Sequence, residues 1–288
     1  MTTVKSFIKR YSVAIYFILA IAVSWGCIVL AVGPGGLPVD PDDSEDTLAM
    51  MYIAMLAGPT LAGLLLTALT TGRAGFRDLR KRLGTWRMDV RWYALALLTA
   101  PLVAMIVLTV LSLFSSTFTL AIITSEDKPA LLFSGLMAGL MVGIFEEIGW
   151  TGFALPRLRQ HANLLTTGLI LGVVWGLWHF LPFWTDDSFT DGLAFMILLA
   201  QLFVWLPPYR LLMVLLHERA ESLLLVILMH ASLLASLQIL VPAELTGSDL
   251  LTWLLAWAAA LWIVAGVMIG STRLQTINTP HKLQESAV

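Results

Sequence analysis

The sequence is poor in charge. Only 12% of its 288 residues are Asp, Glu, Lys or Arg, whereas 58% are hydrophobic. A soluble domain carries about 25% charged residues, so a chain of this composition could not cover itself with a solvated surface. The formal net charge of -2 gives no electrostatic signature of a nucleic-acid partner. These shortages exclude a soluble enzyme and predict an integral membrane protein that contacts the lipid bilayer.

Cysteine is almost absent, because Cys27 is the single example. One cysteine excludes an intrachain disulfide and a cysteine metal site. The sequence also lacks the G-x-S-x-G pattern of a serine-hydrolase elbow. Any catalytic chemistry must therefore come from other side chains.

Long apolar runs are what the sequence has in place of charge. A membrane span needs about 20 apolar residues, and eight such runs fill most of the chain. We expect an all-α, polytopic helix bundle that forms a single membrane domain over residues 1–288. The predicted spans are 11–32, 48–69, 92–114, 130–152, 164–183, 193–216, 223–240 and 250–270.

Basic residues are concentrated in every second connection between these spans, so that these basic connections all fall on one side of the membrane. They precede the first span, fill the connections after the second, fourth and sixth, and recur in the tail 272–288, whereas the other loops are acidic and carry only Lys128. Because basic loops stay inside, we expect a multi-pass protein with both termini in the cytoplasm, in the plasma membrane if the chain is prokaryotic. Residues 73–91 fit an amphipathic surface helix or a solvated basic loop. Pro207 and Pro208 predict a break in the sixth span.

A few ionisable residues stand inside the spans. They are Glu146, Glu147, His179, Arg210 and His230. Each costs at least about 2.5–3.5 kcal/mol at mid-bilayer, so such residues mark functional sites by default. Adjacent helical residues point about 100° apart, so one glutamate can face a substrate while the other braces the site.

Two rows of glycines at four-residue spacing precede Glu147 and His179 along the chain. Small residues at this spacing let helices approach closely in lipid, so the polar side chains should face neighbouring helices. The rows predict that glutamates and histidines converge on one cavity; ordinary packing faces with structural hydrogen bonds are the alternative. The rows are Gly135, Gly139 and Gly143 before Glu147, and Gly168, Gly172 and Gly176 before His179.

Three motifs resemble those of a known family, the CAAX-processing and bacteriocin-processing (CPBP, or Abi) intramembrane proteases. The run at 145–158 is similar to its first motif, E-E-x-x-x-R. Trp175 to His179 is similar to F-x-x-x-H, with Trp for Phe, and His230 to Leu234 is similar to H-x-x-x-N, with Leu for Asn. The resemblance covers about residues 48–236 and relates the chain to the type II CAAX prenyl endopeptidases.

The resemblance implies an endopeptidase that hydrolyses a peptide bond of a peptide or protein substrate near the membrane. Glu146 would activate water, His179 would share the proton transfer, Glu147 would brace the site, and His230 would polarise the carbonyl. Such enzymes are often described as metalloproteases. Glu146, His179 and His230 could bind zinc with an open fourth position, and a metal-free route fits the same residues; both stay open.

Two motif positions depart from the family. Thr151 replaces an arginine that would brace the second glutamate, and Leu234 replaces an asparagine that would stabilise the oxyanion. Arg157, Ser232 and Ser236 are candidate substitutes. The losses leave open a catalytically impaired scaffold or immunity protein of the same fold. A proton-coupled transporter, which would also use ionisable residues inside spans, is a further alternative. The oligomeric state is not predicted.

Overall fold

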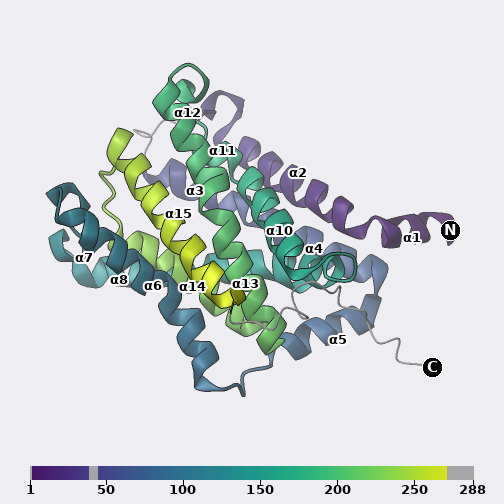
Figure 1. Cartoon of the computed structure of the whole chain (residues 1–288). Helices are drawn as coiled ribbons and strands as arrows, with labels where there is room; N and C mark the ends of the chain where they lie inside the picture. The colour runs from purple at the N-terminus through teal and green to yellow at the C-terminus, as the bar shows by residue number, and fades with distance from the viewer. Residues whose placement is uncertain (1, 39–44, 271–288) are drawn as a thin grey trace.

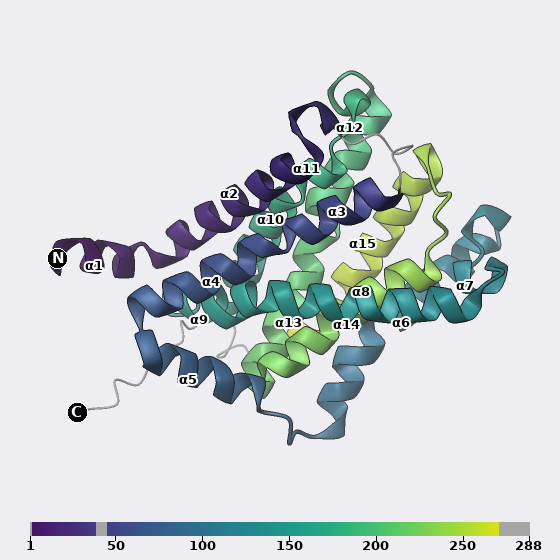
Figure 2. The same cartoon turned by 180° about the vertical axis from the view of Figure 1, so that it is seen from behind.

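The computed structural model describes residues 2–38 and 45–270 (Figures 1 and 2). These residues form helices and turns and contain no strand, which confirms the predicted all-α fold. Two features used to predict the orientation, the acidic residues Asp40, Asp42 and Asp43 after the first span and the tail 272–288, lie outside the described residues.

The described residues contain seven helical segments long and apolar enough to cross a membrane, and a shorter apolar helix. This result confirms a bundle of about eight spans. The long segments are Ser12–Val32 (α2), Asp46–Thr70 (α3, Glu45–Met55, with α4, Ala57–Thr70), Val90–Ser112 (α6), Lys128–Leu158 (α8, Lys128–Gly149, with α9, Leu155–Leu158), Gly192–Ala220 (α12, Gly192–Leu199, with α13, Leu206–Ala220), Leu223–Leu240 (α14) and Gly247–Gly270 (α15). The shorter helix is α10, Leu164–Trp178.

Short helices connect the spans. They are α1 (Thr2–Arg10), α5 (Gly72–Leu83), α7 (Ala121–Thr124) and α11 (Phe180–Phe183). α5 is the predicted amphipathic helix, with Leu79 buried and Arg77 and Arg80 exposed. It ends at Leu83, so residues 84–89 of the predicted segment are not helical.

The fourth span is longer than the predicted 130–152. After α8 the chain continues through a π-helical turn, Trp150–Ala154 (η3), into α9, which makes one segment of 31 residues. Pro156 lies in the first turn of α9, where its missing N–H is tolerated. Glu146 consequently lies near the middle of the segment, as a membrane-buried site requires.

The fifth and sixth spans also differ from their predictions. α10 ends at Trp178, five residues early, because His179 caps it. The predicted break in the sixth span lies at Trp205, directly before the proline pair, and the span continues beyond it as α13. A π-helical turn, Ala200–Val204 (η5), precedes α13, and the prolines fall in the first turn of α13, where they fit a helix.

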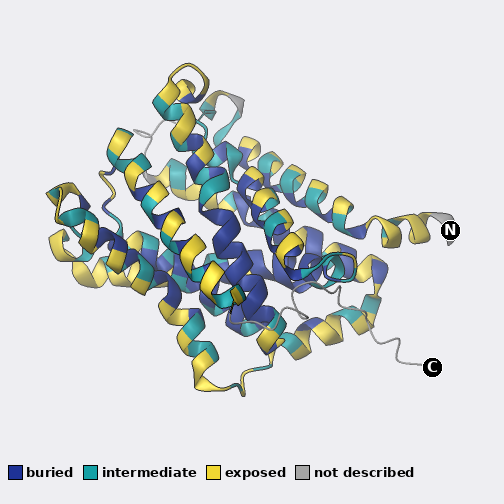
Figure 3. Cartoon of the chain, in the orientation of Figure 1, coloured by how far each residue is buried: buried dark blue, intermediate teal, exposed yellow. Residues whose placement is uncertain are grey.

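The glycine rows form the predicted close helix contacts. A Cβ on Gly139 would lie 2.4 Å from the carbonyl oxygen of Ala231 in α14, and one on Gly176 would lie 1.8 Å from that of Leu202 in η5. Figure 3 shows α13 buried at the centre of the bundle, where every residue from Leu206 to His217 is buried. These contacts hold α8 against α14 and α10 against η5, and α13 packs on both α10 and α14.

Candidate active site

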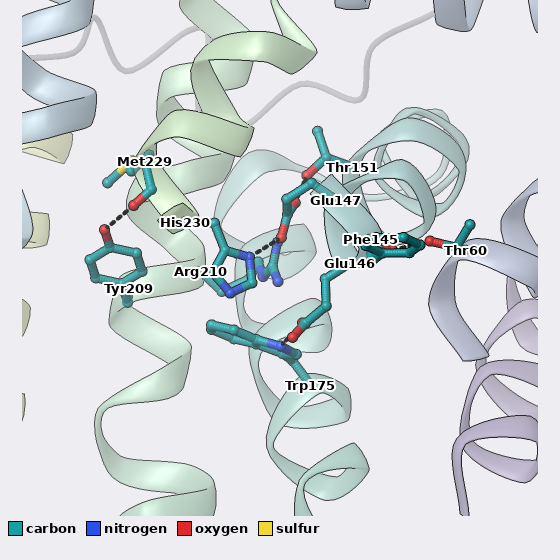
Figure 4. A network of polar contacts seen from close by, with 10 residues as sticks. All are labelled: Thr60, Phe145, Glu146, Glu147, Thr151, Trp175, Tyr209, Arg210, Met229 and His230. Atoms are coloured by element: carbon teal, nitrogen blue, oxygen red, sulfur yellow. Dashed lines mark hydrogen bonds and ion pairs between the residues drawn. The ribbon is translucent and has the colours of Figure 1, made fainter. Parts of the chain in front are cut away.

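Glu146 and Glu147 lie at the end of α8 and are 2% and 0% exposed. Figure 4 shows them pointing to different partners: Glu146 toward Trp175, and Glu147 toward His230, Arg210 and Thr151. This separation follows from the 100° between adjacent helical residues. The two carboxylates therefore occupy different environments.

Glu147 is held by three side chains. Nη1 of Arg210 lies 2.9 Å from both carboxylate oxygens, Nδ1 of His230 lies 2.8 Å from Oε1, and the Thr151 hydroxyl donates to Oε2. All four residues are buried. A buried carboxylate is stable only when charge and hydrogen bonds compensate it, and here both do. Glu147 is a bracing group with its oxygens occupied.

Arg210 belongs to this site although the motifs do not include it. The family arginine would follow Glu147 by four residues on the same helix, where this chain has Thr151. Here the cation instead comes from α13, a different span. An arginine inside a span requires an anionic partner, and that signal could have paired Arg210 with a span-four glutamate.

Trp175 lies between the remaining groups. Its indole Nε1 donates to Oε2 of Glu146 at 2.8 Å. Its ring centroid lies 5.5 Å from that of His179 and 5.2 Å from that of His230, and the guanidinium carbon of Arg210 lies 4.3 Å from it. The structure thus brings the residues of all three motifs around one indole.

Hydrogen bonds fix the orientation of both histidines. Nδ1 of His179 lies 2.8 Å from the carbonyl oxygen of Trp175. A carbonyl only accepts, so Nδ1 carries a proton and, in the neutral ring, Nε2 keeps its lone pair. His230 uses its Nδ1 in the same way, toward the carboxylate of Glu147.

These groups line a cavity of about 580 Å³. Glu146, Trp175, His179 and His230 form its polar part, and Leu234 lies in its wall. The remaining wall is mainly apolar and comes from α3, α8 and α14: Ala49, Tyr52, Ile53, Met55, Ala138, Met141, Val142, Leu233 and Leu237. The predicted convergence on one cavity therefore holds for Glu146, His179 and His230, with Glu147 behind them.

The predicted substitutes for the missing motif residues lie elsewhere. Ser232 donates to the carbonyl of Leu97 in α6, and Ser236 donates to the carbonyl of Ser232. Arg157 donates to the carbonyl of Phe153 and to the hydroxyl of Thr70. None of the three lines the cavity. The structure does not bring these three side chains into the cavity, and their roles as substitutes stay a prediction.

The predicted zinc ligands do not form a ligand set. Among residues 2–38 and 45–270, no three His, Cys, Asp or Glu side chains are grouped closely enough to hold a metal ion. One oxygen of Glu146 accepts from Trp175, and Nδ1 of His179 is bonded to a backbone carbonyl. Zinc binding stays a prediction.

Comparison with known proteins supports the motif assignment. Residues 128–235 match the family described as type II CAAX prenyl endopeptidase Rce1-like. This part of the chain is therefore similar to the CAAX-processing family. The match contains all three motifs, from Glu146 to Leu234. A 50-residue stretch is also 34% identical to CAAX prenyl protease 2 of Methanococcus maripaludis, covering 17% of this chain and 18% of that protein.

Proposed function

We propose that the protein is an intramembrane endopeptidase of the CAAX type. The observation that carries the proposal is the shared cavity of Glu146, His179 and His230, with Glu146 oriented by Trp175 and the second glutamate neutralised behind it. This division leaves one carboxylate for chemistry and one for structure. Hydrolysis of a peptide bond needs a base, a proton donor and a group that stabilises the oxyanion.

Glu146 acts as the general base. Oε2 accepts from Trp175, which leaves Oε1 to take a proton from a water molecule in the cavity. The water oxygen forms a bond to the substrate carbonyl carbon, and the carbonyl oxygen becomes an oxyanion. His230, held by Glu147, donates from Nε2 to this oxyanion when its ring is protonated.

The proton taken from water goes to the leaving group. Glu146, now neutral, passes it to the amide nitrogen directly or through Nε2 of His179, whose lone pair faces away from the Trp175 carbonyl. The C–N bond breaks, and the products are a carboxyl group and an amine. Every atom of the water is accounted for, and Glu146 returns to its starting state.

The apolar wall supports a lipidated substrate. Residues of α3, α8 and α14 surround the space beside Glu146 with aliphatic side chains, an environment that favours a hydrocarbon chain over a polar peptide. We propose a peptide whose cysteine carries a prenyl group, cut close to that cysteine.

Cleavage of a prenylated CAAX peptide by the purified protein in liposomes tests the proposal, with mass spectrometry of the products. We expect the wild type to cut and Glu146→Gln to be inactive, since an amide cannot act as the base yet still accepts from Trp175. Glu126→Gln, on an exposed residue outside the cavity, is the matched control. A wild type that cuts neither the prenylated nor the unprenylated peptide contradicts the proposal and favours a catalytically silent relative.

Metal dependence is tested in the same assay. We propose the metal-free route, because no three His, Cys, Asp or Glu side chains of the described residues are grouped closely enough to hold a metal ion. A membrane-permeable chelator should leave the rate unchanged. A rate that falls with chelator and returns with zinc overturns this part of the proposal and leaves the endopeptidase assignment intact.

The orientation of the chain is a proposal that rests on the basic loops. We propose that α5 and the turn before α10 face the cytoplasm. Reporter fusions at residues 115–120 and 185–190 should report the outer side, and fusions at 84–88 the inner side. An inner-side result at either of the first two positions contradicts the topology.

A further inference from the structure

A second and larger cavity lies at the basic end of the molecule. It has a volume of about 1350 Å³ and is lined by residues of α1, α2, α4, α5 and α9. In Figure 2, α1 and α5 lie at the same end of α4. None of its lining residues belongs to the Glu146 cavity. The candidate protease site therefore does not account for it.

Positive charge dominates the wall of this cavity. Lys9, Arg10, Arg82 and Arg157 line it, against a single carboxylate, Asp78. Asp78 is paired with Arg82 at 2.9 Å. Within the described part of the chain, the other three cations form no ion pair. The cavity thus carries an excess of three positive charges.

Arg157 is the most deeply held of these cations. Its guanidinium carbon lies 3.7 Å from the ring centroid of Phe153, and its nitrogens donate to the Phe153 carbonyl and the Thr70 hydroxyl. These contacts hold the group in place without neutralising it. A fixed, uncompensated guanidinium is a binding site for phosphate oxygens.

The rest of the wall is amphiphilic. Hydroxyl groups of Ser12, Thr67 and Thr70 lie beside apolar side chains of Val13, Phe17, Leu79 and Leu158. A free phosphate would use only the polar part of such a space. Basic pockets between membrane helices, near the membrane surface, suit anionic lipid head groups.

The geometry points to a binding site for an anionic phospholipid, with its phosphate on Arg157, Lys9 and Arg10 and its acyl chains along α2. The site is separate from the proteolytic chemistry, but the two share η3. The Thr151 hydroxyl contacts Glu147, whereas the carbonyls of Thr151 and Gly152 accept from Arg82 in the wall of the lipid site.

Thermal unfolding of the full chain in neutral detergent micelles tests this site. Phosphatidylglycerol added to the micelles should raise Tm by at least about 3 °C relative to equal phosphatidylcholine, since a ligand of the folded state stabilises it. Inorganic phosphate at matched ionic strength should give no comparable rise. An equal rise with phosphate alone identifies a soluble anion as the ligand and overturns the lipid proposal.

Variants show which residues are needed for the Tm rise with phosphatidylglycerol. Arg157→Gln should lose the Tm rise, and so should Lys9→Gln/Arg10→Gln, whose exposed side chains are dispensable for folding. Arg73→Gln/Arg77→Gln is the matched control, because it removes two exposed cations of α5 that do not line the cavity. The lipid site is contradicted if the control loses the Tm rise equally, or if the Lys9→Gln/Arg10→Gln variant keeps the full Tm rise.

Discussion

The indole Nε1 of Trp175 donates a 2.8 Å hydrogen bond to Oε2 of Glu146. The family motif has phenylalanine at this position, and phenylalanine has no N–H to donate. In this chain the second motif therefore contacts the first directly, and the bond selects which oxygen of Glu146 remains available. Trp175 is a positioning residue, since it acts on the reaction through Glu146.

Trp175→Phe should lower kcat about tenfold and leave KM nearly unchanged. A hydrogen bond to a charged group contributes about 1.5–3 kcal/mol, and 1.36 kcal/mol is a tenfold change in rate. The phenyl ring keeps the apolar contacts of the cavity, so substrate binding should persist. The measurement is steady-state cleavage of the prenylated peptide. Trp257→Phe, in a buried position of α15 outside the cavity, is the control; a wild-type kcat for Trp175→Phe would show that the bond does not position Glu146.

The Arg210–Glu147 ion pair predicts that an arginine at position 151, the family position, can replace Arg210 beside Glu147. Arg210→Leu should destabilise the protein by about 3–5 kcal/mol, because it leaves Glu147 as a buried charge without its cation. Thr151→Arg alone should also destabilise, since it adds a second cation to a site that Arg210 already neutralises. The double variant Arg210→Leu/Thr151→Arg restores one cation beside Glu147 at the family position and should recover most of the stability.

Thermal unfolding in detergent measures all three variants. Arg87→Leu, at an exposed residue between α5 and α6, controls for the general loss of a cation. A double variant no more stable than Arg210→Leu would show that the two positions are not equivalent. Thr151→Arg with wild-type stability would show that the site accepts two cations.

Much of the fold could be predicted from sequence because the bilayer restricts it. A sufficiently long apolar run predicts a span. The span at Leu223–Leu240 begins and ends at the predicted residues. The errors fall where polar or proline residues interrupt a span. Two π-helical turns and the cap at His179 decide those boundaries, and hydrophobicity does not encode such local hydrogen bonding.

The residues of the candidate site could be predicted where a sequence motif contains them. They could not be predicted where a side chain from another helix, such as Arg210, binds a motif residue. Glu146, His179 and His230 stand at motif spacings and line one cavity. Arg210 was visible only as a charge in a span, since nothing in one sequence states which helix packs on which. The place of Arg157 could not be predicted for the same reason: it is close to Thr151 along the chain but lines the second cavity.

Close packing of α10 on η5 gives a stability prediction. Gly176→Ala should lower Tm by several degrees, because the added Cβ would lie 1.8 Å from the backbone oxygen of Leu202 and the helices must separate. Gly266→Ala in α15 is the control, with no atom within 4 Å of its Cβ; alanine there should be neutral or stabilising. Equal Tm values for the two variants would contradict the packing argument.

The last prediction concerns Leu234, which replaces the motif asparagine and lies in the wall of the cavity. Leu234→Asn places an amide donor where the oxyanion would form, and a single such donor is worth about 10²–10³ in kcat when it is removed from enzymes that have one. We expect kcat for the prenylated peptide to rise at least about tenfold, despite some loss of stability from burying an amide.

Leu237→Asn is the matched control, because Leu237 lines the same cavity without occupying the motif position. An equal rise in both variants would mean that polarity alone, and not a placed donor, speeds the reaction. A fall in both would assign Leu234 to the binding of the substrate's apolar group. If only Leu234→Asn cuts while the wild type does not, the native chain is a silent relative whose missing oxyanion donor is the cause, since every other group of the cavity would be shown to be competent.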